Sequence, residues 1–282
     1  IGNIILAYFF GKLFYNEKTG IMAAFLMSIF PLEVVYSTKL LTDLPSSFFM
    51  ALGVYLFFYS EKNSGRRAYY FLSGIFIGVG YLLRESAALI ALFFLIYVIF
   101  KRQIKIDYFI VSAGFLAMFA LEFFVYYQLI GDPLFRFTSV QDNLLEEYKA
   151  FNYYGRLSFP QGLFHYPYVI LTNSLISYFY VLIFIAISYF LIIKKKDTYL
   201  LIFWFISLLL YLSIGSVSFS HYIPFRAEPR YLSVITIPGI VLLALFLTGK
   251  SKLVRKIIMP LSLALLLLTS IASSYAHRSN DA

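Results

Sequence analysis

The sequence predicts an all-α fold: a polytopic transmembrane helical bundle of about ten spans, with residues 1–282 forming one domain. Hydrophobic residues make up 61% of the chain and charged residues only 13%, whereas a soluble domain carries about 25% charged residues. This apolar excess is too large for one soluble core. Its distribution in long runs with few charges is typical of helices that cross a lipid bilayer.

Ten apolar segments follow one another along the chain. Several are shorter than the ~20 residues that a crossing helix needs, but Tyr, Lys and Arg side chains at their ends can reach the headgroup region. The segments cover approximately residues 1–15, 20–38, 45–60, 68–83, 86–100, 106–130, 166–193, 199–217, 231–248 and 257–275.

The stretches between these segments alternate between basic and non-basic. The basic set holds 15 of the 23 Lys and Arg residues, so the positive-inside rule predicts that it is cytoplasmic. Its members are Lys12, Lys18, Lys62, Arg66, Arg67, Lys101, Arg102, Lys105, Lys194, Lys195, Lys196, Lys250, Lys252, Arg255 and Lys256. The net charge of +9 is explained by these loops, and we expect no nucleic-acid partner.

The alternation of the loops also predicts the direction in which the first segment crosses the membrane. The first segment has to run from the outside to the inside, and the sequence begins at Ile1 within an apolar run. We therefore expect an odd number of preceding spans, most simply one, if the complete N-terminus is cytoplasmic.

The sequence excludes some kinds of site. It contains no Cys, so disulfides and Cys-ligated metals are ruled out. The three His residues match no metal-binding spacing. We find no Gly-rich phosphate loop and no nucleophile elbow.

Ionisable residues at the ends of spans are energetically costly, so they are candidates for function. In FPLEVVYSTKLLTDLP these are Glu33 and Asp43. Asp43 also suits a helix cap because it precedes Pro45, and the alternative for Glu33 is an ion pair with Lys39. Both residues lie on the predicted non-cytoplasmic side.

Three further groups lie on the same predicted side. Arg84 could grip a phosphate, or it could form a local ion pair with Glu85 at an interfacial turn. Arg226 and Arg230 could also bind phosphate, with interfacial anchoring as the alternative. For Glu122 a polar contact between helices is favoured over catalysis.

Residues 131–165 form the sizeable non-cytoplasmic loop. The segment mixes acidic and aromatic residues, and LLEEYKAF suggests a short amphipathic helix at the membrane surface. A loop of this length commonly has a function. Arg136, Asp142 and His165 are its candidate substrate contacts.

The run FPLEVVYSTKLLTDLPSSFFMALGVYLFFYS resembles GT-C membrane glycosyltransferases, in particular the branch of protein O-mannosyltransferases and aminoarabinose transferases (glycosyltransferase family 39). Asp43 matches that branch's acidic residue at the start of a span. The run FLSGIFIGVGYLLRESAAL is similar to the Gly-rich span of that branch, with Arg84 at the position where the branch has Lys. The run PRYLSVITIPGIVLLA resembles its Arg-Tyr-Leu pattern followed by Pro, which Arg230 and Tyr231 match. The family's first acidic motif lies before Ile1, so we expect this chain alone to be inactive.

The resemblance implies transfer of a sugar from a polyprenyl-phosphate donor to a protein, lipid or glycan acceptor. Asp43 and Glu33 would be the catalytic residues, while Arg84, Arg226, Arg230 and Tyr231 would bind the donor phosphate. The expected location is the plasma membrane, in contact with its lipids. Some family members use a divalent cation (Mg or Mn), and no other cofactor is implied.

A transporter or lipid flippase is the alternative from another class, and a non-catalytic scaffold is a third. A transporter places ionisable groups near the bilayer midplane, often in repeats, and here they gather at one face without a repeat. The enzyme interpretation predicts that Asp43, Arg84 and Arg230 lie around one cavity beneath residues 131–165.

Overall fold

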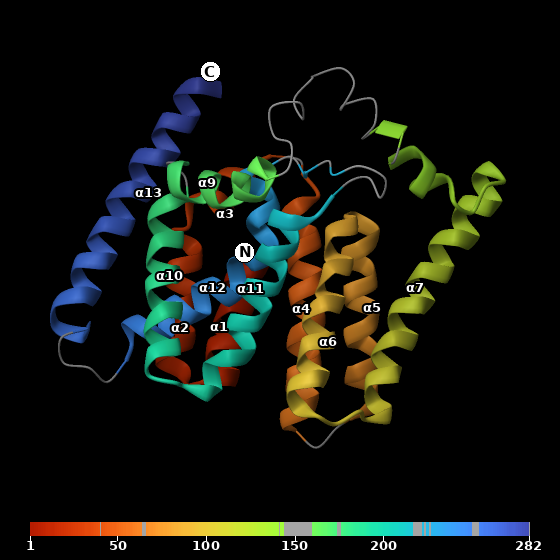
Figure 1. Ribbon diagram of the computed structural model, residues 1–282, viewed down its shortest axis with the longest axis horizontal. Helices are drawn as coiled ribbons and strands as arrows, with labels where there is room; N and C mark the ends of the chain where they lie inside the picture. Colours follow the sequence, from red (N-terminus) through yellow and green to blue (C-terminus); the bar gives the residue numbers. More distant parts are fainter. Residues whose placement is uncertain are drawn as a thin grey trace.

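The computed structural model is a bundle of helices (Figure 1). It describes residues 1–39, 41–63, 66–140, 142–143, 160–173, 176–216, 222, 224–225, 227–249 and 254–281. Within this part of the chain the only extended pairing is an isolated bridge between Ser216 and Pro224. The predicted all-α class is therefore confirmed.

The first half of the chain supplies seven of the labelled helices. They are α1 (Gly2–Phe14), α2 (Glu17–Ser28), α3 (Pro31–Tyr36), α4 (Asp43–Lys62), α5 (Arg67–Leu83), α6 (Ile90–Lys101) and α7 (Ile106–Ile130), with a 3₁₀ turn at Glu85–Leu89.

The prediction of one continuous helical segment over residues 20–38 is wrong. Phe30 has extended backbone angles (φ −71°, ψ 116°), and Pro31 then starts the six-residue α3. Proline disfavours a helical conformation in the residue before it and suits the first turn of a new helix. The break places Glu33 in a short connecting helix outside the long ones.

The second half contains α9 (His165–Thr172), α10 (Ser177–Ile192), α11 (Tyr199–Ile214), α12 (Ser233–Leu247) and α13 (Met259–Asp281). The predicted segment 166–193 is also divided, because Asn173 adopts an extended conformation (φ −76°, ψ 116°) that ends α9. At the centre, α12 packs against α1, α2, α4, α10 and α11. All of its residues are buried.

Among the described residues, four helical stretches are long and apolar enough to cross a membrane: 106–130, 196–214, 229–247 and 256–273. Three shorter apolar helices cover 2–14, 67–83 and 178–192. The expected number of about ten spans is not confirmed, because several helices are shorter than a full crossing and α3 and α9 are brief.

The basic turns share one end of the bundle, the lower end in Figure 1. The Lys62 ammonium group contacts the Leu13 carbonyl oxygen, and Lys105 Nζ lies 2.9 Å from Glu61 Oε1. The Tyr15 hydroxyl donates to the Asp197 carbonyl at 3.4 Å. These contacts gather the turns after α1, α4, α6 and α10, as the alternation of charge predicts.

Close packing between α5 and α7 depends on two glycines that face each other. A Cβ atom added at Gly74 would lie 1.9 Å from the Val111 carbonyl oxygen. One added at Gly114 would lie 2.3 Å from the Phe71 carbonyl oxygen. Both contacts are with backbone, which has little freedom to move aside, so small residues set this helix separation.

We expect Gly114→Leu to lower stability, because the new side chain would force α5 and α7 apart; overpacking of this kind costs ~1–3 kcal/mol or more. Ala113→Leu is the matched control, since Ala113 is exposed on the same helix. The measurement is the thermal unfolding midpoint in detergent. Equal midpoints for the two variants would contradict the packing described.

Candidate functional site

A cluster of charged and aromatic side chains lies at the end of the bundle opposite the basic turns. Asp43 is the first residue of α4, and Arg84 follows the last residue of α5. The Asp43 side chain is 1% exposed and forms an ion pair with Arg84 Nη1. The Arg84 guanidinium lies 4.1 Å from the centre of the Tyr231 ring, within the range of a cation–π contact.

The close approach of α4 to α5 explains why residues 41 positions apart in the sequence meet. Gly80 faces the first turns of α4, where an added Cβ would lie 3.0 Å from both the Ser46 carbonyl oxygen and the Met50 nitrogen. The Ser46 hydroxyl donates to the Gly80 carbonyl at 2.9 Å. Because Arg84 leaves the helix one turn later in an extended conformation (φ −160°, ψ 133°), its side chain reaches Asp43.

A second arginine joins the cluster from the turn Pro229–Leu232. Arg230 Nε lies 2.5 Å from Glu228 Oε2, and Arg230 Nη2 donates to the Tyr231 hydroxyl at 3.4 Å. The Arg230 guanidinium is 5.2 Å from the Tyr231 ring centre. Two arginines therefore share one tyrosine, each with a carboxylate partner.

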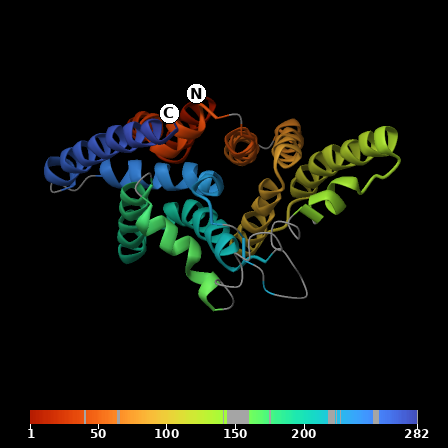
Figure 2. The same cartoon turned by 90° about the horizontal axis from the view of Figure 1, so that it is seen from above.

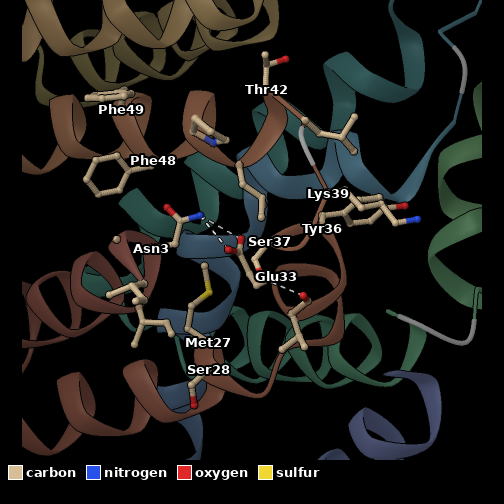
Figure 3. Close-up of a pocket in the computed structure, with 17 residues that line it drawn as sticks. Asn3, Met27, Ser28, Glu33, Tyr36, Ser37, Lys39, Thr42, Phe48 and Phe49 are labelled. Carbon is tan, nitrogen blue, oxygen red and sulfur yellow. Dashed lines mark hydrogen bonds between the residues drawn. The ribbon is translucent and has the colours of Figure 1, made fainter. Parts of the chain in front are cut away.

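Next to this cluster is an open cavity of about 820 Å³ between α1, α3 and the start of α4 (Figure 3). Asn3, Glu33, Tyr36, Lys39 and Thr42 supply polar groups to its wall, and most of the remaining wall is apolar. Asp43, Arg84 and Arg230, which were predicted to surround one cavity, are all absent from the wall of this one, although Thr42 and Leu44 belong to it.

Glu33 points into this cavity and accepts two hydrogen bonds from Asn3 Nδ2, at 3.2 Å and 3.0 Å (Figure 3). Burial raises the pKa of the Glu33 carboxyl to about 7, and the hydrogen bond from Asn3 offsets part of the rise. The sequence analysis did not identify Asn3. A lone amide within an apolar run is the signal that could have found it.

Arg136 is the centre of a separate ionic network. Its Nε donates to Glu85 Oε1 at 2.8 Å and its Nη1 to Glu122 Oε1 at 2.5 Å. The same guanidinium donates to the carbonyl oxygens of Tyr81 and Leu82 at 2.9 Å and 3.2 Å. It thereby satisfies carbonyls at the end of α5 that lack helical partners and ties the segment after α7 to both helices.

This network separates the neighbours Arg84 and Glu85. The local ion pair considered for them is not the arrangement found, because Arg84 pairs with Asp43 and Glu85 pairs with Arg136. Glu122 makes the polar contact that was favoured for it. The donors of Arg136 are used within the protein, which leaves its predicted contact with substrate without structural support.

Asp142 and His165 are the other predicted site residues that the structure describes. Asp142 is exposed. His165 begins α9, and burial lowers the pKa of its imidazole. Arg226 lies outside the described residues, as do LLEEYKAF and most of the segment 131–165.

In the described part of the chain, no three His, Asp or Glu side chains gather as metal ligands would. The divalent cation considered above has no ligand set among these residues, and we assign no step to it.

Asp43 and Arg84 should be energetically coupled. Removing one partner of a buried ion pair leaves the other charge uncompensated, so Asp43→Asn and Arg84→Gln should each destabilise the protein. The double variant should lose less than the sum, by ~0.5–3 kcal/mol. Unfolding midpoints of the four proteins measure the coupling. Additive losses would favour the alternative in which Asp43 acts only at the helix terminus.

The pKa of Glu33 predicts a pH dependence of stability. The carboxyl pKa is about 7 in the folded protein against an ordinary value of 4.5. Between these values the folded state binds more protons than the unfolded state, so stability falls as pH rises from about 5 to about 8, by roughly 1–3 kcal/mol. Glu33→Gln should remove this part of the pH dependence of the unfolding midpoint. Glu17→Gln, an exposed control, should retain it.

The chain is similar to a known family in sequence and to a solved structure in fold. The sequence profile of the family described as dolichyl-phosphate-mannose-protein mannosyltransferase matches residues 1–127. Among curated protein sequences, none matches the chain. One solved structure that matches is the crystal structure of the Archaeoglobus fulgidus oligosaccharyltransferase in complex with zinc and sulfate, at 15% identity and a TM-score of 0.50.

That match covers 96% of this chain but 40% of the archaeal chain, so the present sequence spans well under half of its length. At 15% identity the likeness concerns the fold. The chain is thus similar to this mannosyltransferase family over residues 1–127 and to the archaeal oligosaccharyltransferase in its helical fold.

Proposed function

We propose that this protein is a membrane glycosyltransferase that moves a sugar from a polyprenyl-phosphate donor to an acceptor hydroxyl, at the end of the bundle that carries Asp43, Arg84 and Arg230. The observation that carries the proposal is the pair of guanidinium groups around Tyr231, beside a buried carboxylate and an open cavity. By the positive-inside rule this end faces away from the cytoplasm, and the plasma membrane is the proposed location.

The arginines suit the donor phosphate. A lipid-linked sugar has its phosphate at headgroup depth, where a helix end meets water. An arginine stays charged and offers paired donors that match phosphate oxygens. Arg84 is 22% exposed and Arg230 is 25% exposed, so both retain accessible surface. Positive charge at this position stabilises the lipid phosphate as it leaves with the electrons of the broken bond.

Glu33 suits the acceptor side. It lines the cavity, and a carboxyl pKa of about 7 allows it to accept a proton near neutral pH. The acceptor oxygen would form a bond to the anomeric carbon while the bond from that carbon to the phosphate oxygen breaks. The acceptor proton would pass to Glu33. A protein, lipid or glycan hydroxyl satisfies this chemistry equally.

Asp43 is the positioning residue in this proposal. Its carboxylate is buried and engaged with Arg84 rather than facing the cavity. Holding Arg84 against the Tyr231 ring would orient the guanidinium before the phosphate arrives, which reduces the entropy lost on binding. Asp43→Asn should therefore impair donor use more than acceptor use.

Transfer by the complete protein should depend on the two arginines. Supplied with a set of polyprenyl-phosphate sugars, Arg84→Ala and Arg230→Ala should each lower transfer by roughly a hundredfold or more, because each removes charge that stabilises the leaving phosphate. The measurement is radiolabelled sugar recovered in acceptor, with protein, lipid and glycan acceptors assayed separately.

Lys18→Ala is the control, since Lys18 is an exposed cation at the opposite end of the bundle. It should transfer at the rate of the unaltered protein. If Arg84→Ala and Arg230→Ala both matched this control, the assignment of the phosphate site would be wrong.

A further inference from the structure

The bundle carries a second feature that the proposed transferase site does not use. A groove of about 600 Å³ runs between α6 and α7. Its wall is almost entirely apolar, with Phe57 of α4 and Ile77 of α5 at its base and Phe94 and Phe115 on its sides. Tyr97 and Tyr108 line it as well.

The groove exists because α6 and α7 separate after the turn that joins them. The two helices hardly contact each other, since α6 packs against α11 and α7 packs against α5. Figures 1 and 2 show α7 leaning away from its neighbours toward its C-terminal end. The groove extends from Tyr97 to Ile90 along α6, and a helix rises ~1.5 Å per residue, so it is at least ~10 Å deep. That depth and its apolar wall suit part of an acyl chain.

The end of the groove next to the turn between α6 and α7 is strongly basic. Residues 61–67 and 101–107 contribute six basic and two acidic side chains, a net charge of +4. Lys101 Nζ lies 5.8 Å from the centre of the Tyr97 ring, and Lys105 Nζ lies 5.9 Å from that of Tyr108. Cations are therefore placed directly beside two residues of the groove wall.

Glu61 holds this end together. It accepts hydrogen bonds from the hydroxyls of Tyr70 and Tyr97, at 2.5 Å and 3.1 Å, and from Lys105 at 2.9 Å. Lys105 is thereby fixed in place, whereas Lys101 and Arg102 are exposed. Arg102 has a positive φ of 51°, which ends α6 and turns the chain toward α7. The exposed cations thus lie at the mouth of an apolar groove.

We propose that this groove binds an anionic phospholipid, with an acyl chain between α6 and α7 and the headgroup phosphate at Lys101 and Arg102. Basic pockets between transmembrane helices bind anionic headgroups in this way, and the positive surplus selects them over zwitterionic ones. The proposed headgroup position is at the opposite end of the bundle from Arg84 and Arg230, and the apolar groove runs from there as far as Ala88 in the turn Glu85–Leu89. Its ligand is bound and not consumed, so the inference is independent of the proposed transfer reaction.

The test is native mass spectrometry of the complete protein in a nonionic detergent, titrated with dioleoyl-phosphatidylglycerol or dioleoyl-phosphatidylcholine. The unaltered protein should retain phosphatidylglycerol preferentially. Replacing both cations, Lys101→Gln with Arg102→Gln, should weaken that binding about tenfold or more. Ser112→Phe fills the groove wall while keeping every charge, and it should weaken binding of both lipids.

The control replaces Lys12 and Lys18 with Gln, which removes the same charge from exposed positions at the same end. It should bind phosphatidylglycerol as the unaltered protein does. Circular dichroism identifies any variant that fails to fold. If either Ser112→Phe or the Lys101/Arg102 variant fails to fold, lipid binding by the other variant tests the proposal. Equal binding of the two lipids, or equal losses in the control and the Lys101/Arg102 variant, would overturn the proposal.

Discussion

Burial of Asp43 is the constraint on which the candidate site depends. A carboxylate that is almost fully removed from water has to be paired, because the penalty for an isolated buried charge is several kcal/mol. Arg84 supplies the pairing, and the close approach of α5 to α4 at Gly80 brings it within reach. The same guanidinium then contacts Tyr231, which connects the first half of the chain to the turn before α12. Helix packing, charge pairing and the candidate phosphate site are thus parts of one arrangement.

Charge segregation along the chain made much of the fold predictable. Apolar runs identified the helices, because a helix satisfies its own backbone hydrogen bonds within a bilayer. The alternation of basic loops placed Asp43, Arg84 and Arg230 at the same end, and the structure brings them together with Tyr231. Their chemical roles remain predictions, since geometry alone does not test a reaction.

Other features could not be derived from composition and periodicity. The division at Phe30 and Pro31 depends on a local backbone conformation, and the division near Asn173 ends a helix inside an apolar run. The partners of Arg136 lie between 14 and 55 residues away in the sequence, so nothing local indicates them. Adjacent residues Arg84 and Glu85 belong to different networks because the chain is extended at Arg84, which directs the two side chains to different helices.

The complete burial of α12 has a consequence for how the protein is assembled. Its residues 233–247 are the centre against which α1, α2, α4, α10 and α11 pack, yet they are synthesised after all of those helices. Membrane helices insert first and associate afterwards. The earlier helices are therefore inserted in the bilayer before α12 is available to cover their inner faces. Biogenesis of this protein thus includes an interval in which most of the helices are inserted but the central helix α12 is absent.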